Sequence, residues 1–261
     1  MERSKKALVV VSFGTTYPDA RRAIENLEER LCAAFPGYDF YRAFTSRMVA
    51  RKIEKEEGVH IPSPAELFEQ LAEQGYEEVR CQSLHVIFGQ EYEKMMEQLR
   101  PFAGRFARLA VGAPLLWDTQ DYLRLTRALL ETMPRLAEDE AYVFMGHGTE
   151  HPANAAYALV ENCFRYQGAE RVYVGTVEGF PHFDYITARL HRHEVVNVHL
   201  APLMIVAGDH AQNDLAGDDA DSWKSRLEGE GYGVEPHLTG LGELDAVADI
   251  FISHCREAQP L

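Results

Sequence analysis

Long apolar segments are missing from this chain of 261 residues, and so is the basic charge of a nucleic-acid-binding protein. Its longest apolar run is far shorter than the roughly 20 residues that a membrane-spanning helix needs. Against 41 aspartates and glutamates stand 26 lysines and arginines, which gives a formal net charge of -15, whereas binding to phosphate backbones needs the opposite sign. We therefore expect neither a nucleic acid nor a membrane as partner.

Cysteine is scarce as well. The chain has 4 cysteines, and no two of them form a C-x-x-C pair, which disfavours a disulfide framework. The short apolar run near the start is not followed by a cleavage-site pattern, so we interpret it as the first strand of the fold and not as a secretory leader. Reduced thiols in a cytoplasmic protein are the expectation. The four cysteines are Cys32, Cys81, Cys163 and Cys255.

Several familiar catalytic motifs are also missing. The sequence contains no GxxxxGK[ST] loop, no GxGxxG fingerprint, no GxSxG elbow and no HExxH pair. "SFGTT" at residues 12–16 is compatible with a phosphate at a helix start, but a lone Gly-Thr-Thr is common. A phosphate-handling enzyme is therefore a minor alternative.

What is present is a regular alternation of β-branched runs with amphipathic segments. Such alternation predicts an α/β protein whose mostly parallel sheets are covered by helices on both faces. The expected strands lie within residues 6–16, 39–44, 77–87, 108–116, 140–149, 170–179, 194–207 and 233–238.

The second half of the chain resembles the first. "SFGTT" at 12–16 resembles "GHGTE" at 146–150, and "APLL" at 113–116 resembles "APLM" at 201–204. We predict two similar Rossmann-like halves, 1–136 and 137–261, each a parallel sheet flanked by helices. Chance similarity among βα units is the alternative. Ligands of such folds bind beyond the carboxyl ends of the strands or in the cleft between the halves.

Three polar residues stand at expected strand ends in the second half. His147 lies between two glycines, Glu178 precedes Gly179, and His210 follows Asp209, which is available to hydrogen-bond a backbone group or an imidazole. Any one of these residues taken alone is more typical of a hydrogen-bonded surface group. Together, two imidazoles and a carboxylate indicate an open site for cobalt, iron, nickel or zinc.

An acidic run follows His210. It contains Asp214, Asp218, Asp219 and Asp221. We interpret it either as a solvated loop or as a mouth that attracts cations.

Several stretches together resemble the short sirohydrochlorin cobaltochelatases of the anaerobic pathway, which share the class II chelatase fold with ferrochelatases. The resemblance runs over nearly the full length of the chain. The stretches that carry it are "VSFGTT" at 11–16, "RAFTSRMVARKI" at 42–53, "SLHVIFGQEYEKM" at 83–95, "MGHGTEHPAN" at 145–154, "VGTVEGFP" at 174–181 and "AGDHAQNDLAGDDADSWK" at 207–224.

The resemblance implies that His147, Glu178 and His210 hold a metal ion in the cleft between the halves. It gives His147, His210 and Glu91 catalytic roles, Glu91 facing the site from the opposite side. The proline that is common in the family's loop is replaced by Phe88 or a neighbour, which puts the local backbone in doubt. Contacts with the substrate are expected from Arg47, Ser12, Phe13 and His85.

The implied reaction is insertion of Co(II) into sirohydrochlorin or a related precorrin, with release of two protons, on the route to cobalamin. The metal ion is then a substrate, and no permanent cofactor is expected. Fe(II) or Ni(II) would use the same residues, since affinity order and availability determine the metal. A noncatalytic metal or tetrapyrrole carrier is the other alternative. A homo-oligomer is compatible with the chain, although no sequence pattern identifies an interface.

Overall fold

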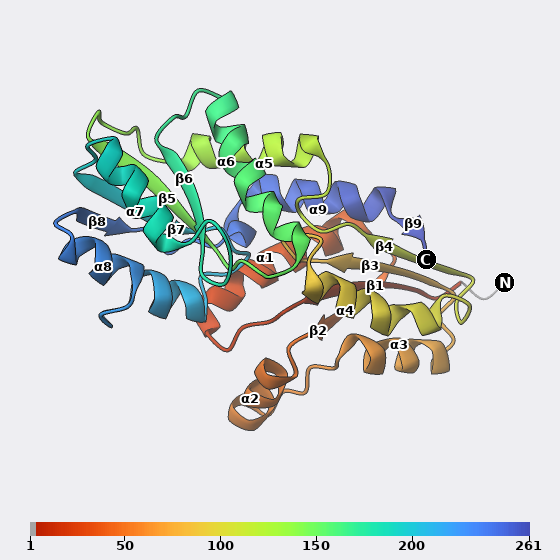
Figure 1. Ribbon diagram of the computed structural model, residues 1–261. Coiled ribbons are helices and arrows are strands. Elements are labelled where there is room, and N and C mark those ends of the chain that lie inside the picture. Colours follow the sequence, from red (N-terminus) through yellow and green to blue (C-terminus); the bar gives the residue numbers. More distant parts are fainter. Residues whose placement is uncertain (1–3) are drawn as a thin grey trace. The chain divides into compact units, whose positions relative to one another are not determined.

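The computed structural model describes residues 4–261, so residues 1–3 of the expected N-terminal half lie outside the description. The chain divides into two compact units (Figure 1). The N-terminal unit comprises Met1–Trp117, described from residue 4 onward, together with Val247–Leu261. The C-terminal unit comprises Asp118–Ala246.

The N-terminal unit contains a five-stranded sheet in the order β2-β1-β3-β4-β9, parallel except for the last strand. Central β1 reads as a continuous apolar run because helices cover both faces of the sheet, and Ala7–Val11 are almost completely buried. The strands are β1 (Lys6–Ser12), β2 (Asp39–Phe44), β3 (Glu78–Ser83), β4 (Arg108–Gly112) and β9 (Gln259–Pro260). The helices are α1 (Pro18–Ala34), α2 (Arg47–Glu57), α3 (Pro64–Glu73), α4 (Gln90–Leu99) and α9 (Asp245–Glu257), with a 3₁₀ turn at Arg100–Phe102.

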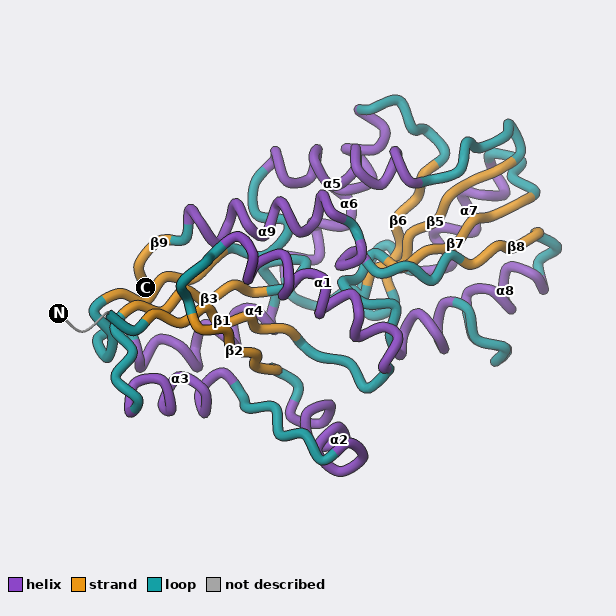
Figure 2. The backbone as a smooth tube through the Cα atoms, turned by 180° about the vertical axis from the view of Figure 1, so that it is seen from behind, coloured by secondary structure: helices purple, strands orange, loops and turns teal. Residues whose placement is uncertain are grey.

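The C-terminal unit contains a four-stranded parallel sheet in the order β6-β5-β7-β8, which Figure 2 shows side by side. Phe144 of β5 stacks on Phe164 of α6 on one face of this sheet, while Phe183 and Trp223 pack in the core of the other face. The strands are β5 (Glu140–Gly146), β6 (Val172–Thr176), β7 (Asn197–Pro202) and β8 (Gly233–Pro236). The helical segments are α5 (Thr119–Thr132), α6 (Ala155–Tyr166), α7 (Phe183–Arg192), α8 (Trp223–Gly229), 3₁₀ turns at Pro152–Asn154 and Leu241–Glu243, and a π-helical turn at Ala211–Leu215.

The two parallel sheets have the same topology. In each, the first strand of the unit lies between the second and the third, and the fourth strand follows the third. This repeated order confirms the predicted fold class of two similar Rossmann-like halves.

The bounds of the units differ from the expected division at residue 136. Helix α5, which follows β4, belongs to the C-terminal unit, and α9, which follows β8, belongs to the N-terminal unit. Side-chain contacts explain this exchange: Gln167 donates to Thr126 of α5 at 2.7 Å, and Arg80 of β3 donates to the carbonyl of Cys255 in α9 at 2.8 Å. Sequence order places a helix after its strand but does not specify the sheet on which it packs.

One helix was not expected. The acidic stretch that follows His210 contains α8, whose first residue, Trp223, packs on Phe183 at 5.3 Å between ring centroids. Ser222 caps this helix by accepting a hydrogen bond from the backbone N–H of Ser225. Because aspartates and glycines surround this short segment, its sequence does not show a clear helical pattern. Ser63 caps α3 in a similar way: its hydroxyl accepts from the backbone N–H of Glu66, and the carboxylate of Glu66 accepts from the backbone N–H of Ser63.

Within the described residues, no helix is both long and apolar enough to cross a membrane. All four cysteines are free thiols.

Candidate metal centre

His147 has two polar neighbours, Glu178 and His210, beyond the carboxyl ends of the strands of the C-terminal unit. His147 follows β5, Glu178 follows β6 and His210 follows β7. The ring centroids of the two histidines lie 4.6 Å apart at 88°, and Oε2 of Glu178 lies 3.7 Å from Nδ1 of His147. Residues 63 positions apart in the chain are thus brought into contact, as the sequence predicted; their role as metal ligands stays a prediction.

Backbone hydrogen bonds hold the first two of these residues side by side. Val177 N–H donates to the carbonyl of Gly146 at 3.1 Å, and Glu178 N–H donates to the carbonyl of His147 at 2.8 Å. The ladder between β5 and β6 therefore continues past the strand ends. The loops carry their polar side chains on a regular, sheet-like frame.

Both histidines use Nδ1 for a hydrogen bond within the protein. Nδ1 of His147 lies 2.9 Å from the carbonyl oxygen of Gly148, and Nδ1 of His210 lies 2.6 Å from Oδ2 of Asp214. Carbonyl and carboxylate oxygens only accept, so each Nδ1 donates, and in the neutral tautomer of such a ring Nε2 is the nitrogen with the lone pair. Acceptors of this kind are typical partners of metal-bound histidines, because they set the tautomer and the orientation of the ring.

Glu178 is placed more loosely than the histidines. Its carboxylate lies beside Nδ1 of His147, and 59% of its side chain is exposed. Shared coordination with Nε2 of His147 therefore requires rotation of the carboxylate. Over the described residues, the one group of three or more donors whose ligand atoms all lie within 4.8 Å of one another is elsewhere, at His199, Glu235 and His237.

Glycine is required on each side of His147 for a different structural reason. A Cβ at Gly146 would lie 2.2 Å from Cε1 of Tyr157, so the backbone approaches this buried ring closely. Gly148 has φ of +82°, and a Cβ there would lie 2.7 Å from the backbone nitrogen of Gly179. Close approach of a neighbouring group and a positive φ are both conformational reasons for glycine.

Asn154 connects the two loops that carry His147 and Glu178. Its Oδ1 accepts a hydrogen bond from the backbone N–H of Thr149 at 3.0 Å, and its Nδ2 donates to the carbonyl of Phe180. The side chain thereby fixes the spacing between the loops. It was quoted within a motif but assigned no role, since a lone asparagine carries no sequence signal of this kind.

Asp214 is a second residue to which the sequence assigned no specific partner. Asp209, expected to hydrogen-bond a backbone group or an imidazole, accepts from Nδ2 of Asn213 at 3.0 Å, and Asp214 lies 2.6 Å from Nδ1 of His210. The π-helical turn at Ala211–Leu215 places these partners on the same side. A His-x-x-x-Asp spacing was the signal that could have identified it. The rest of the acidic run is surface, as shown by Asp218, which pairs with Lys224 and is 97% exposed.

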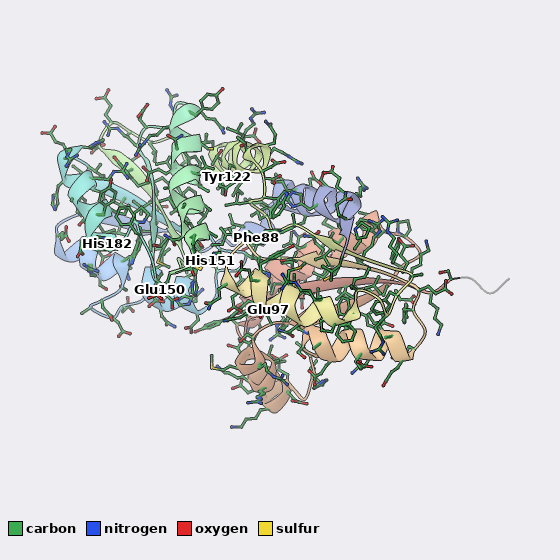
Figure 3. The ribbon with its side chains drawn as sticks, turned by 45° about the vertical axis from the view of Figure 1, so that its right-hand side comes forward. Phe88, Glu97, Tyr122, Glu150, His151 and His182 are labelled. Carbon is green, nitrogen blue, oxygen red and sulfur yellow. The ribbon has the colours of Figure 1, made fainter. Side chains whose placement is uncertain are left out.

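A hollow of about 220 Å³ borders the candidate metal centre. It includes Thr176 at the end of β6, His182 and Asp184 at the start of α7, and Asp214, the partner of His210. Figure 3 labels His182 in this region, and Glu150 and His151 in the loop that follows β5. Space for a ligand thus adjoins the histidine pair.

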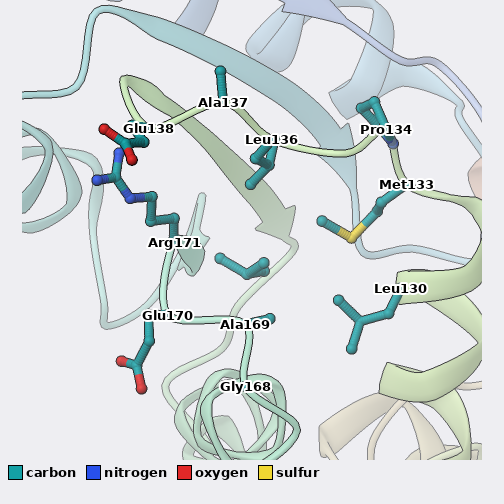
Figure 4. Close-up of a pocket in the computed structure, with 11 residues that line it drawn as sticks. Leu130, Met133, Pro134, Leu136, Ala137, Glu138, Gly168, Ala169, Glu170 and Arg171 are labelled. Atoms are coloured by element: carbon teal, nitrogen blue, oxygen red, sulfur yellow. The ribbon is translucent and has the colours of Figure 1, made fainter.

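A larger hollow, of about 400 Å³, lies at the opposite edge of the sheet (Figure 4). It is lined by segments that precede β5 and β6, among them Leu136 and Arg171. Because ligands of parallel sheets collect at the carboxyl ends of strands, its position disfavours a catalytic role.

The N-terminal unit holds the other candidate residues at the carboxyl edge of its own sheet. Ser12 and Phe13 follow β1, Arg47 starts α2 after β2, and His85 follows β3. The hydroxyl of Ser12 is buried and makes no hydrogen bond among the described residues, whereas Phe13 is 48% exposed. Arg47 is exposed as well.

His85 and Glu91 have contrasting environments. Nδ1 of His85 lies 2.7 Å from the hydroxyl of Ser83, and burial lowers the pKa of the imidazole to about 4, so it is neutral at physiological pH. Glu91, in the first turn of α4, pairs with Lys94 at 2.8 Å and has 39% of its side chain exposed. Of these two side chains, the carboxylate of Glu91 is therefore the one with an ion-pair partner.

Phe88 lies in the loop before α4, where the resemblance led us to expect that Phe88 or a neighbour replaces a proline. Its ring lies 5.0 Å from that of Tyr92 and 5.5 Å from that of Trp117, and Phe88 and Trp117 remain partly exposed, at 39% and 56%. Aromatic packing here holds the loop in place of a rigid proline. The cluster was not predicted, because its members are far apart in the sequence.

Solved structures with the same architecture define the class of fold. A structure of SirB from Bacillus subtilis with Fe³⁺ superposes with a TM-score of 0.66 at 15% identity, covering 97% of this chain and 95% of that one. A multi-domain protein from Deinococcus radiodurans, described as structurally similar to chelatases, gives a TM-score of 0.64 at 17% identity over 98% of this chain and 56% of that one. The fold is therefore a chelatase fold.

Sequence comparison identifies the family. The model of the family described as cobalt chelatase (CbiK) matches residues 6–259, and the chain belongs to this family. The curated protein named sirohydrochlorin cobaltochelatase from Salmonella typhimurium is 45% identical over 97% of this chain and 96% of its own length. The sirohydrochlorin cobaltochelatase CbiKC from Nitratidesulfovibrio vulgaris is 36% identical over 98% of this chain and 91% of its own length.

Proposed function

We propose that this chain is a sirohydrochlorin cobaltochelatase, which inserts Co(II) into sirohydrochlorin and releases two protons. Two observations support the proposal: family membership over residues 6–259, and a histidine pair whose Nδ1 atoms are both engaged by acceptors. The second observation carries the mechanism. With Nδ1 engaged in both rings, Nε2 is the nitrogen of each histidine that we propose binds the metal.

In this proposal the cobalt ion is a substrate held by His147, His210 and Glu178. Neutral imidazoles suit Co(II), and three protein ligands leave positions that the pyrrole nitrogens take over. The exposed carboxylate of Glu178 rotates onto the ion and off it again, because its contact with His147 is long, at 3.7 Å. A loosely held third ligand favours delivery of the metal over storage.

Insertion also requires an acceptor for the pyrrole protons. His85 is a poor base at neutral pH because burial lowers its pKa to about 4, so we assign it to contact with the macrocycle. Glu91 is the carboxylate of the N-terminal unit proposed to accept a proton. We propose that the bound macrocycle is bent, because bending turns the nitrogen lone pairs toward the metal and lowers the barrier.

Sirohydrochlorin is a polycarboxylate, whereas the protein carries a net charge of -15. Binding therefore needs a local cation. Arg42 does not supply it, because Nε of this residue donates to the buried carboxylate of Glu28 at 2.7 Å. Arg47 and Arg51 are exposed one turn apart on α2, and we propose Arg47 as the contact with a substrate carboxylate.

The test is anaerobic absorbance spectroscopy of the purified protein with sirohydrochlorin and, separately, Co(II), Fe(II) and Ni(II). We expect metal-dependent conversion of the spectrum that is fastest with Co(II) and is lost in His147→Ala and His210→Ala. His191→Ala is the matched control, since this exposed histidine also pairs with an acid, Glu230, at 3.1 Å. It should retain full activity.

Other outcomes separate the alternatives. Faster conversion with Fe(II) or Ni(II) would reassign the metal, and tight binding without conversion would make the protein a carrier. Unchanged turnover in both histidine variants would refute the site itself. The proposal also includes a cytoplasmic location and a homo-oligomer, for which cell fractionation and light scattering on the purified protein are the measurements.

A further inference from the structure

A second cluster of histidines lies on the sheet of the C-terminal unit, apart from the candidate metal centre. His199 is in β7, Glu235 is its direct partner in β8, and His237 follows β8 immediately. In a parallel pair, partnered residues and residues two apart point to the same face of the sheet. All three side chains therefore lie on one face, on two adjacent strands, and none of them belongs to the candidate metal centre.

The donor atoms of this cluster converge. Nδ1 of His199 lies 2.9 Å from Nε2 of His237 and 3.4 Å from Oε2 of Glu235, and Oε1 of Glu235 lies 3.9 Å from Nε2 of His237. A metal bound at about 2.0–2.1 Å by each donor separates adjacent donors by about 3.0 Å in an octahedron and about 3.4 Å in a tetrahedron. The spacings of 2.9 and 3.4 Å match these edges, and the spacing of 3.9 Å has to shorten by movement of the exposed Glu235 side chain.

Neighbouring residues hold the two rings in this arrangement. Tyr142 of β5, the register partner of His199, stacks on His199 at 14° and on His237 at 15°. The backbone N–H of His237 donates to the carbonyl of Leu200 at 2.7 Å, which anchors the residue to β7. Both rings are thus oriented before any ion arrives, as a binding site requires.

The surroundings favour a cation. The side chain of His199 is 11% exposed and that of His237 30%, while two carboxylates face the pair: Glu235, and Glu140 with Oε2 at 3.9 Å from Nε2 of His199. Two imidazoles and a carboxylate on an open edge, without cysteine, are the donor set of an exchangeable borderline ion such as Zn(II), Co(II) or Ni(II). A shared proton between the two rings is the competing interpretation.

We propose that His199, Glu235 and His237 form a second divalent-metal site, which clamps the edge strand β8 onto β7. Strand β8 has only four residues and pairs with β7 alone. A metal with ligands on both strands links β8 to β7 through coordinate bonds. Metal binding should therefore protect β8 from local opening. The proposal can be tested independently of the chelatase reaction, because metal binding and protein stability are measured without turnover.

The experiment uses untagged full-length protein freed of metal by a chelator and dialysed against Zn(II) or Co(II), with bound metal measured by elemental analysis. We expect His147→Ala/His210→Ala to retain one equivalent and to lose it when His237→Gln is added. Zn(II) should raise the melting temperature of the double variant by several degrees and leave that of the triple variant unchanged. Co(II) bound in the double variant should show ligand-field absorption that disappears with His237→Gln.

The matched control is His191→Gln, added to the same double variant. This histidine also faces a carboxylate, but no second imidazole contacts it among the described residues, so the equivalent of metal should remain. If the double variant binds no metal, or if its metal survives His237→Gln, the cluster is a proton-sharing histidine pair and the proposal is overturned. If the double variant is unstable, loss of one equivalent on His237→Gln in the otherwise native chain decides the question, and an unchanged stoichiometry refutes the site.

Discussion

Nδ1 of His210 and Oδ2 of Asp214 lie 2.6 Å apart, one helical turn from each other in the chain. Asp214 accepts a hydrogen bond from Nδ1, which leaves the other ring nitrogen for the proposed metal. The acceptor of the second histidine is a backbone carbonyl, that of Gly148. A substitution can therefore remove the carboxylate of Asp214, whereas the backbone carbonyl of Gly148 cannot be removed in this way.

Replacement of Asp214 by asparagine tests this support. The amide keeps the size of the side chain but loses the charge, so the imidazole becomes a weaker donor. We expect a 10–100-fold loss of Co(II) affinity, measured by titration of the metal-free protein. Asp218→Asn is the control, since Asp218 is 97% exposed and pairs with Lys224. Equal losses in both variants would show a general charge effect and no specific support.

Gly148→Ala tests the backbone beside His147. The new Cβ meets a φ of +82° and the backbone nitrogen of Gly179 at 2.7 Å. We expect a loss of about 2–4 kcal/mol in the free energy of unfolding, from left-handed strain and overpacking together. Gly168→Ala has a similar φ of +87° with no atom within 4 Å, and should lose only about 1 kcal/mol. Urea denaturation gives both values. Equal losses in the two variants would show that overpacking against Gly179 contributes nothing at position 148.

Asn154→Ala tests the link between the loops of His147 and Glu178. Removal of the amide leaves the N–H of Thr149 and the carbonyl of Phe180 without their partner. We expect a loss of about 1–3 kcal/mol in stability and a raised KM for Co(II). The exposed Asn162 on α6 provides the control substitution, Asn162→Ala. A stability loss with an unchanged KM would limit Asn154 to a structural role.

From the lowered pKa of His85 we predict that the stability of the protein depends on pH. Its pKa in the folded protein is lowered to about 4 from an ordinary value near 6.5 because burial disfavours the charged ring. Between these values the unfolded chain binds a proton that the folded protein does not, so stability falls as pH decreases from about 6.5 to 4. Each pH unit in this window costs at most about 1.4 kcal/mol.

The measurement is urea denaturation from pH 4.5 to 7.5 in the wild type and in His85→Gln. The variant should be less sensitive to acid within this window and parallel to the wild type above it. His191→Gln, with an exposed imidazole, should keep the slope of the wild type. Identical slopes in wild type and His85→Gln would refute the assignment.

Local pattern was sufficient for much of this protein. Runs such as Ala7–Val11 are apolar at every position because both faces of the sheet are covered, and this separates strands from amphipathic helices along the sequence. Parallel strands also bring their carboxyl ends to one edge, which is why His147, Glu178 and His210 could be expected to meet. Chain order and sheet physics carry that information without coordinates.

Other features depend on contacts between distant residues. The exchange of α5 and α9 between the units, the pairing of His210 with Asp214, and the convergence of His199 with His237 are all set by packing and register. No local periodicity encodes them, because each requires two segments to be placed before their side chains can touch. The residues that support the candidate site, such as Asn154, therefore become visible only in three dimensions.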